Sequence, residues 1–269
     1  MELRAAREPA SPDAGDFATL LRQHGLYPPQ AAIAAPSPGS PFATPTQATT
    51  ILAFKFAGGV LVAGDRRATA GNTVVYDRAD KVLEIDTHSL MAIAGVPATA
   101  WEMARVLEHS FQFYRRSQLQ EMSLEGKVRA LSKLLRDNLG FVLQGVGVVV
   151  PIFAAFDSIA ATARLYFYDA MGAQFEAADY AATGSGSPAV RSVLHYENTW
   201  GTKPLVKRRE SEAIVLALRA LDTAAETDTA TGGVDRRGRV YPIIKIISKA
   251  GIRTLAEKDL ARVFQREVS

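Results

Sequence analysis

The sequence predicts an α+β fold in which two packed sheets carry a layer of helices on each outer face. The first observation behind this is the order of the apolar segments, which runs strands, two helices, strands, one helix, strands. That order is neither a regular strand–helix alternation nor an all-β pattern. The second is the balance of 48% apolar and 22% charged residues, which is typical of a folded globular domain. The third is that no internal repeat divides the chain.

The first 48 residues differ in composition from the rest of the chain. They hold eight of the thirteen prolines. Proline removes a backbone donor and fixes φ, so this segment cannot form a sheet ladder or a long helix. Residues 16–25 predict one short amphipathic helix, capped by Asp16 and ended by Gly25. We expect residues 28–48 to form an extended linker.

Four strands follow the linker. Each is a short apolar or alternating run bounded by turn residues. The predicted strands span residues 50–56, 60–64, 81–86 and 89–95. The segment Ala57-Gly58-Gly59 joins the first two as a turn.

Two amphipathic helices come next. Over residues 98–117, apolar side chains recur at three- and four-residue spacing, from Trp101 through Leu107 to Tyr114. Residues 123–143 repeat this spacing. A helix with this period presents one apolar face, so we expect both helices to cover a sheet.

The remaining elements complete the predicted order. Residues 148–156, 163–168 and 180–183 predict strands, 210–227 a helix, 240–248 a strand and 256–266 a last short helix. The longest apolar run, residues 145–156, contains Pro151. It is too short to span a bilayer, so we interpret it as a buried strand.

Composition excludes several classes of function. A net charge of +3 is small, and the basic clusters at residues 115–116, 207–209 and 236–239 are typical of solvated surface. The chain has no cysteine, which excludes disulfides, Cys-based zinc sites and a thiol nucleophile. The N-terminus has no apolar core of signal-peptide length. We therefore expect a soluble, cytoplasmic protein that binds neither nucleic acid nor membrane.

Familiar cofactor and metal motifs are missing as well. There is no phosphate-binding glycine loop, and the four histidines are scattered without ligand spacing. Ser185 lies between two glycines, but a serine elbow requires glycine two residues to either side, where Thr183 and Ser187 stand. A serine hydrolase is poorly supported, and we expect no cofactor and no metal.

Polar and glycine residues gather at the ends of the predicted strands. They are Thr49 and Thr50, Asp65, Lys81, Gly95, residues 184–186, and residues 228–233 after the long helix. Singly, each has a structural explanation: threonine favours strands, aspartate and glycine favour turns, and a lysine at an edge is solvated. Their order and spacing along the chain are more specific than any one of them.

The motifs are Thr49-Thr50-Ile51, Gly58-Gly59-Val60, Ala63-Gly64-Asp65-Arg66-Arg67-Ala68-Thr69, Lys81, Ile93-Ala94-Gly95, Gly184-Ser185-Gly186-Ser187, and Asp228 with Gly232-Gly233. In this order and spacing they resemble the β subunits of 20S proteasomes, most closely the actinobacterial branch. The resemblance covers about residue 48 to the C-terminus. It implies the N-terminal-nucleophile hydrolase fold, a four-layer αββα sandwich of two antiparallel sheets between helical layers. That fold agrees with the element order above.

The resemblance implies a threonine protease. A threonine hydroxyl is a weak nucleophile that needs a base beside it. An α-amino group has a pKa of about 7.7–8.0 and can serve as that base, so a threonine at a free N-terminus supplies both groups. Residues 1–48 are then a propeptide removed by autocleavage between Ala48 and Thr49, and residues 49–269 are the protease domain.

The same resemblance implies roles for the other matched residues. Lys81 would lower the pKa of the Thr49 amine and hydroxyl, and Asp65 would pair with Lys81. The backbone N–H of Gly95 would form the oxyanion hole. Ser185, Asp228 and Thr231 would form a supporting polar network. Thr69 would pair its backbone with an extended substrate.

Departures from the family pattern and the specificity pocket give further expectations. Ala48 stands where glycine is usual before the cut, which would slow autocleavage, and Thr231 stands where serine is common. Pro97 removes a backbone N–H that the family gives to the bound peptide, so peptide docking would be altered or weaker. The pocket for the residue before the cut would have the apolar walls Ala68, Ala79, Leu83 and Ile93, which favours cleavage after hydrophobic residues.

The resemblance also implies partners. They are proteasome α subunits and other β subunits in an α7β7β7α7 barrel, an ATPase ring activator, and unfolded polypeptide substrates. Two alternatives stay open. One is a shorter, HslV-like two-ring protease, which usually has Gly-Gln where this chain has Arg66-Arg67 and has almost no leader. The other is a non-catalytic ring subunit, which would not need Thr49, Asp65 and Lys81 together.

Overall fold

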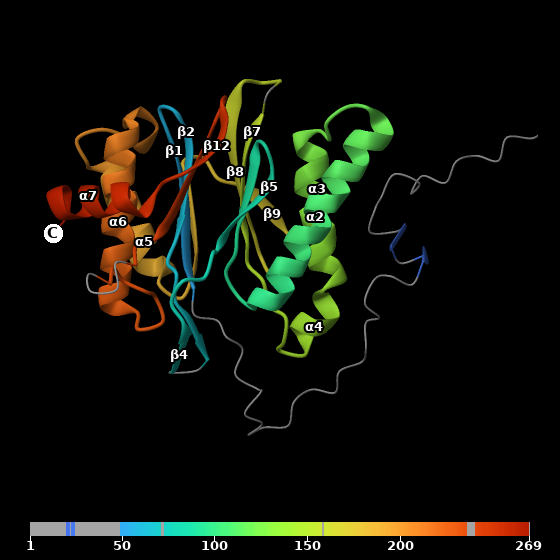
Figure 1. The fold of residues 1–269 in the computed structure, drawn as a ribbon, viewed down its shortest axis with the longest axis horizontal. Helices are drawn as coiled ribbons and strands as arrows, with labels where there is room; N and C mark the ends of the chain where they lie inside the picture. Colours follow the sequence, from blue (N-terminus) through green and yellow to red (C-terminus); the bar gives the residue numbers. More distant parts are fainter. Residues whose placement is uncertain are drawn as a thin grey trace, which may run out of the picture.

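Four layers make up the protein. The computed structural model describes residues 20, 21, 23, 24, 49–70, 73–157, 159–235 and 240–268. Two five-stranded antiparallel sheets lie face to face, and helices cover the outer side of each (Figure 1). The expected αββα sandwich is therefore confirmed.

The first sheet has the strand order β10-β1-β2-β11-β12. Its strands are β1 (Thr50–Phe56), β2 (Gly59–Gly64), β10 (Tyr180–Gly184), β11 (Ile243–Ser248) and β12 (Gly251–Thr254). In β1, Leu52 and Phe54 face the helices, whereas Ile51 and Ala53 face the second sheet. Both faces of the strand are buried, which explains its nearly continuous apolar sequence.

The second sheet has the strand order β5-β6-β7-β8-β9. Its strands are β5 (Val82–Asp86), β6 (Ser89–Ala92), β7 (Ile152–Asp157), β8 (Thr162–Tyr168) and β9 (Gln174–Glu176). Val82, Leu90 and Ile152 face the first sheet and form, with Ile51 and Val62, the core between the sheets. A separate hairpin, β3 (Ala68–Ala70) with β4 (Thr73–Tyr76), extends from the end of the first sheet (Figure 1).

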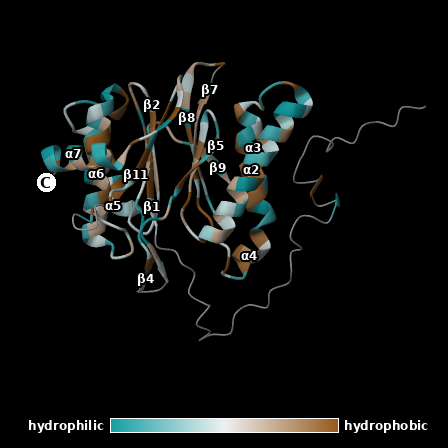
Figure 2. Ribbon diagram, in the orientation of Figure 1, coloured by the Kyte–Doolittle hydropathy of each residue, from teal (hydrophilic) through white to brown (hydrophobic). Residues whose placement is uncertain are grey.

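Helices cover the two outer faces. On the second sheet lie α2 (Pro97–Gln118) and α3 (Leu124–Asp137), followed by the short α4 (Leu139–Leu143). On the first sheet lie α5 (Ser187–Thr199), the 3₁₀ turn η1 (Leu205–Lys207), α6 (Glu210–Thr227) and α7 (Glu257–Glu267). Figure 2 shows hydrophobic colour concentrated in the strands and mixed colour on the helices. Amphipathic helices over apolar sheets produce this pattern.

The predicted boundaries hold for β1 and α6. The strand predicted over 89–95 ends at Ala92, and the strand predicted over 240–248 begins at Ile243. Two further differences have a clear cause. The single helix predicted over 123–143 is wrong, because α3 ends at Asp137 and α4 starts at Leu139. Between them, the Asn138 side chain donates to the Gly147 carbonyl at 2.6 Å. The strand predicted over 148–156 begins only at Ile152, directly after Pro151, which cannot donate to a ladder.

Several elements were not predicted. The helix α5 follows the glycine-rich segment 184–186 and has Pro188 near its start, a position that proline tolerates. The strands β3, β4, β9 and β12 are each three or four residues long, too short for a periodic signal. Trp101, predicted on the apolar face of α2, is 45% exposed.

Two further expectations concern residues 1–48. Most of the predicted helix 16–25 lies outside the described residues, although Leu20, Leu21 and Gln23 are helical and the His24 N–H donates to the Leu20 carbonyl. Ala48 also lies outside them. Within the described part of the chain, no helix is both long and apolar enough to cross a membrane.

Candidate active site

Four chain segments meet at one end of the sandwich. Thr49 immediately precedes β1, and Thr50 pairs with Gly184 at the end of β10. Asp65 follows β2, and Lys81 precedes β5. All four polar residues are buried. The structure thus brings together residues that the sequence separates by more than a hundred positions.

Asp65 connects most of these segments. Its Oδ1 accepts hydrogen bonds from the Thr50 N–H at 2.8 Å and from Lys81 Nζ at 2.7 Å. Its Oδ2 accepts from the N–H groups of Arg67 and Gly232, both at 2.9 Å. A fully buried carboxylate is tolerable only when it is hydrogen-bonded and paired, and Asp65 meets both conditions.

Lys81 is held beside the start of β1. Its Nζ donates to Asp65 Oδ1 and, at 2.5 Å, to the Arg67 carbonyl. Burial lowers the pKa of Lys81 below its ordinary value, and the charge of Asp65 opposes this shift. The expected pairing of Asp65 with Lys81 is present in the structure.

A second polar network surrounds Asp228. Its Oδ2 accepts from Ser185 Oγ at 2.6 Å and from Thr231 Oγ1 at 2.5 Å, and its Oδ1 accepts from the Ala230 N–H at 3.1 Å. Burial tends to raise the pKa of Asp228, but the hydrogen bonds from Ser185 and Thr231 outweigh burial and leave this pKa lowered. The three residues expected to cooperate are therefore in direct contact.

Thr50 links this network to the first strand. The Gly186 N–H donates to Thr50 Oγ1 at 2.9 Å, and Thr50 Oγ1 lies 2.6 Å from Thr231 Oγ1. Because the Thr231 hydroxyl donates to Asp228, the Thr50 hydroxyl donates to Thr231. Thr50 was not among the predicted site residues, although its place beside Thr49 was a usable signal.

Two positions require glycine because a backbone carbonyl of another segment lies too close for a Cβ. Gly184 has φ +98°, and a Cβ there would lie 1.8 Å from the Thr49 carbonyl oxygen. That same carbonyl accepts the Ser185 N–H at 3.0 Å, which fixes Thr49 against β10. Gly95 has φ +114°, and a Cβ there would lie 2.0 Å from the Val148 carbonyl oxygen. The conformation of Gly95 is restricted to glycine, and its role as oxyanion donor stays a prediction.

The residues expected to contact substrate flank Lys81 and β3. Ala79 and Ile93 are buried, and the Ile93 N–H donates to the Lys81 carbonyl at 2.9 Å. Ala68 and Thr69 form β3, and Leu83 lies on β5, partly buried. Pro97 is the first residue of α2. Of these residues, Ile93 bonds the Lys81 backbone directly, whereas Leu83 packs against the core beneath α2 and α3. Their contacts with substrate remain predictions.

Arg67 is a further residue that the sequence argument left without a role. Its Nη1 donates to the carbonyls of Thr229 at 2.9 Å and Thr231 at 3.3 Å. Its own backbone bonds Asp65 and Lys81. Arg67 therefore connects the Asp65–Lys81 pair to the loop that carries Asp228 and Thr231.

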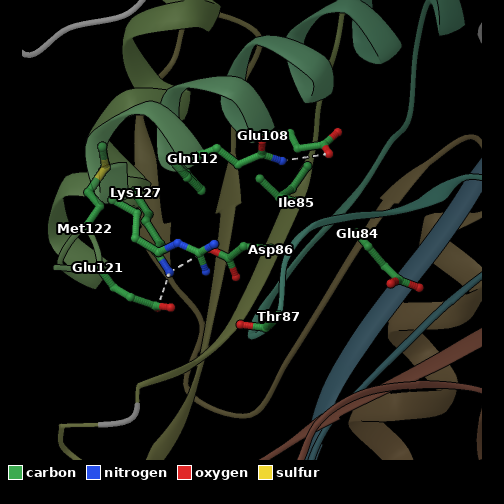
Figure 3. Close-up of a pocket in the computed structure, with 11 residues that line it drawn as sticks. Glu84, Ile85, Asp86, Thr87, Glu108, Gln112, Glu121, Met122 and Lys127 are labelled. Atoms are coloured by element: carbon green, nitrogen blue, oxygen red, sulfur yellow. Dashed lines mark hydrogen bonds and ion pairs between the residues drawn. The ribbon is translucent and has the colours of Figure 1, made fainter. Parts of the chain in front are cut away.

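A separate cavity of about 340 Å³ lies between α2, the start of α3 and the β5–β6 turn (Figure 3). Its polar groups are largely engaged with one another. Lys127 Nζ lies 2.7 Å from Asp86 and 3.8 Å from Glu121, and the Gln112 side chain donates to Glu108. This cavity contains none of the candidate catalytic residues. Among the described residues, no cluster of three or more His, Cys, Asp or Glu side chains could hold a metal ion.

Comparison with known proteins gives a consistent result. A family model described as "Proteasome subunit" matches residues 46–237. A "Proteasome subunit beta" of Jonesia denitrificans is 41% identical over 213 residues, covering 79% of this chain and 68% of the relative. A "Proteasome subunit beta 2" of Thermomonospora curvata is 39% identical over 222 residues, covering 82% and 76%. A "Proteasome subunit beta" of Streptomyces griseus is 36% identical over 246 residues, covering 91% and 81%.

Proposed function

The chain belongs to the proteasome subunit family, and from this we propose that it is a catalytic β subunit of a 20S proteasome. In this role it hydrolyses peptide bonds of unfolded proteins with Thr49 as an N-terminal nucleophile. The observation that carries the proposal is the position of Asp65. One carboxylate oxygen binds both the amide that follows Thr49 and the ammonium group of Lys81.

This geometry gives Thr49 the surroundings that its chemistry needs. The Lys81 ammonium and the Thr50 N–H donate to the same oxygen of Asp65, so Lys81 lies close to Thr49. Its positive charge favours the neutral amine and the ionised hydroxyl of Thr49. The free α-amino group takes the hydroxyl proton, directly or through water. Thr49 Oγ then attacks the scissile carbonyl, the amine product leaves with a proton, and water hydrolyses the ester.

Removal of the leader uses the same nucleophile and forms the same kind of ester, but the Thr49 nitrogen is still an amide and cannot be the base, so water carries the hydroxyl proton to that nitrogen as it leaves. Thr49 Oγ forms a bond to the Ala48 carbonyl carbon, and the bond from that carbon to the Thr49 nitrogen breaks. The nitrogen becomes the free amine, and water releases residues 1–48 from the hydroxyl. Residues 1–48 are thus the propeptide and residues 49–269 the protease domain. The tight fit of the Thr49 carbonyl against Gly184 supports a fixed position for the attacking residue.

Two sets of groups would assist the reaction, one at the oxyanion and one at the new N-terminus. The Gly95 N–H would donate to the tetrahedral oxyanion, and loss of one such donor costs about 10²–10³ in rate in comparable sites. Ser185, Asp228 and Thr231 would bind the new N-terminus and hold its proton network. The hydrogen bonds among these three residues support this assignment.

Substrates would bind as extended chains against Thr69, with an apolar residue in the pocket of Ala68, Ala79, Leu83 and Ile93. The partners are proteasome α subunits and further β subunits in an α7β7β7α7 barrel with an ATPase ring, in the cytoplasm. Membership in the proteasome family supports assembly with other subunits.

The structural-subunit alternative makes a different prediction about the N-terminus. Mass spectrometry of the chain, co-expressed with its α partner, measures processing and assembly together. We expect the parent chain to begin at Thr49 and to cleave fluorogenic peptides. Thr49→Ala should assemble, keep its leader and show no peptidase activity. An intact leader on the parent chain within an assembled particle would establish the structural subunit instead.

The HslV-like alternative is weaker. Arg66 and Arg67 are both engaged here, Arg66 with Glu257 and Arg67 with the Thr229 and Thr231 carbonyls. A glycine in place of Arg66 would lose the ion pair with Glu257, and a glutamine in place of Arg67 would bring fewer donors and no charge. A particle made of β rings alone, active without α subunits in the mass-spectrometry experiment, would favour this alternative.

A further inference from the structure

A buried lysine stands in the layer between the two sheets. Lys245 on β11 is 6% exposed. It alternates along its strand with Ile243 and Ile247, which pack into the core between the sheets. Residues two positions apart in a strand share one face, so Lys245 also faces the second sheet. A charged side chain in such a place needs partners.

The partners of Lys245 are two carboxylates at the start of the second sheet. Its Nζ lies 3.5 Å from Asp80 Oδ2 and donates to Glu84 Oε1 at 3.1 Å. Thr254, which is paired with Lys245 across β11 and β12, also donates to Glu84 Oε1, at 3.4 Å. Two neighbouring strands of the first sheet are thus tied to β5.

The two carboxylates stand on either side of Lys81. Asp80 immediately precedes it, and Glu84 follows it by three residues. Asp80 also holds the local backbone, because its Oδ1 accepts the Val82 N–H at 2.9 Å while its Oδ2 faces Lys245. Such an aspartate turn fixes the residue that it spans, which here is Lys81.

Two side-chain links therefore join the first sheet to the start of β5. Lys81 reaches Asp65, which follows β2, at 2.7 Å. Lys245, paired with Val62 of β2, reaches Glu84. Along both chain segments the two links are three residues apart, which is about 10 Å of strand. The second link holds the strands at the separation that the Lys81–Asp65 contact requires.

The position of the chain, not the charge of Lys245, is what this link controls. Besides burial, the charged groups that most affect the pKa of Lys81 are Asp65, Arg67 and Asp228. The charge of Lys245 is compensated where it stands, by its own two carboxylates. Lys245 therefore acts on the site through β5.

We propose that Lys245 is a positioning residue for peptide hydrolysis, which holds the start of β5 so that Lys81 stays in contact with Asp65. The inference rests on the proposed function, because it assigns Lys245 to the reaction of Thr49. The side chains of Asp80 and Glu84 are 46% and 51% exposed, so water solvates them when Lys245 is replaced. An apolar side chain of similar volume then costs little in fold, whereas only a cation ties both carboxylates to the first sheet.

The test compares Lys245→Met and Lys245→Arg with the control Lys127→Met, each in the full chain co-expressed with its α partner. Lys127 is matched to Lys245, because it is also buried and pairs with a carboxylate of β5. That carboxylate, Asp86, is the last residue of β5 and lies away from Lys81. Mass spectrometry counts the chains that begin at Thr49, steady-state kinetics on a fluorogenic peptide is normalised to that count, and thermal melts establish that each variant is folded.

Lys245→Met should lower kcat by about tenfold or more and leave KM within about twofold, because displacing a catalytic group costs rate and not substrate binding. The acid limb of the pH profile should also move to higher pH. A Lys81 ammonium that lies farther from Thr49 lowers the pKa of its amine less, so the amine loses its proton at a higher pH.

The other variants separate positioning from a general loss of fold. Lys245→Arg keeps the cation, and its half-exposed partners leave room for the longer side chain, so it should retain most of the activity. Lys127→Met should keep the kcat, KM and pH profile of the parent. Glu84→Ala removes the shorter contact from its exposed end, where the fold is not at risk, and should lower kcat by several-fold.

Three results would overturn the inference alone, given an active parent. They are an equal kcat in Lys245→Met and Lys127→Met, a loss of activity that Lys245→Arg does not restore, and an unchanged kcat in Glu84→Ala. A parent chain that assembles without peptidase activity would instead overturn the proposed function, and this inference with it.

Discussion

At the scale of single residues, the carboxylate of Asp65 determines how the candidate site is held together. It accepts one hydrogen bond from each of four donors, on Thr50, Lys81, Arg67 and Gly232. An amide side chain of the same size could not accept at both positions, because one of its atoms is a donor. Only an ionised aspartate satisfies this arrangement in a fully buried place.

Asp65→Asn therefore tests the ion pair directly. It leaves the Lys81 ammonium buried without its counter-charge, and we expect the free energy of unfolding to fall by about 3–5 kcal/mol. Peptidase activity should fall by about 10²-fold or more, since the carboxylate that holds Lys81 beside Thr49 is lost. Urea unfolding and a fluorogenic peptide assay measure the two effects.

The control is Asp86→Asn, which breaks the pair of the partly buried Asp86 with the buried Lys127 away from the site. It should lower stability while the specific activity of the folded protein stays near that of the parent. Equal loss of activity in both variants would show that the Asp65 effect is a general loss of fold.

Asp228 gives a prediction about pH. Its pKa in the folded protein is lowered, so its contribution to stability is fully present above the ordinary pKa of aspartate and is lost as pH falls through the lower folded value. Asp228→Asn should therefore lower the melting temperature at neutral pH, and the gap to the parent should shrink below about pH 4. Calorimetry across this range measures the gap, and a gap that does not change with pH contradicts the assignment.

Pro97 gives a prediction about substrate. As the first residue of α2 it has no N–H to donate to a bound peptide. Pro97→Ala restores that donor without disturbing the helix start, and we expect KM for peptides to fall by several-fold or the preference to shift, as one added hydrogen bond allows. Steady-state kinetics on a small peptide panel measure this. No gain and no shift would show that the position does not contact substrate.

At the scale of elements, the start of β1 depends on the end of β10. Gly184→Ala would place a Cβ 1.8 Å from the Thr49 carbonyl oxygen, at a positive φ that alanine disfavours. We expect the melting temperature to drop by several degrees, as a loss of a few kcal/mol implies, and leader removal to slow.

Gly140→Ala is the control, because a Cβ there meets nothing within 4 Å and the residue lies in α4. It should be neutral or slightly stabilising. Equal effects of the two substitutions would contradict the steric argument.

The elements also show which features the sequence could predict. The bounds of β1 and α6 were predicted correctly, because β1 is a continuous apolar run and α6 carries its apolar residues at helical spacing. The break at Asn138 and the helix α5 were not, since each depends on a contact or cap that apolar periodicity does not record. In the site, Asp65 and Lys81 could be matched by motif. Arg67 and Thr50 stand in the quoted motifs, but their roles depend on hydrogen bonds across the fold to Thr229, Thr231 and Gly186, which the motifs do not record.

At the scale of the whole molecule, the candidate site joins the two sheets. Asp65 follows β2 of the first sheet, whereas Lys81 leads into β5 of the second. Their 2.7 Å ion pair therefore depends on how the sheets pack against each other. The core between the sheets, which includes Leu90 and Val62, sets that packing. Interiors are close-packed, so a cavity there shifts the neighbouring strands.

Leu90→Ala tests this dependence, and Leu131→Ala on α3 is its control. Both leucines are fully buried, Leu90 between the sheets and Leu131 between the second sheet and its helices. Each substitution should lower the free energy of unfolding by about 2–5 kcal/mol. Leu90→Ala should in addition lower kcat by several-fold, because a small displacement of catalytic groups is costly to rate. Urea unfolding and steady-state kinetics compare the two variants, and an equal kcat in both would mean that the inter-sheet core does not position Lys81 against Asp65.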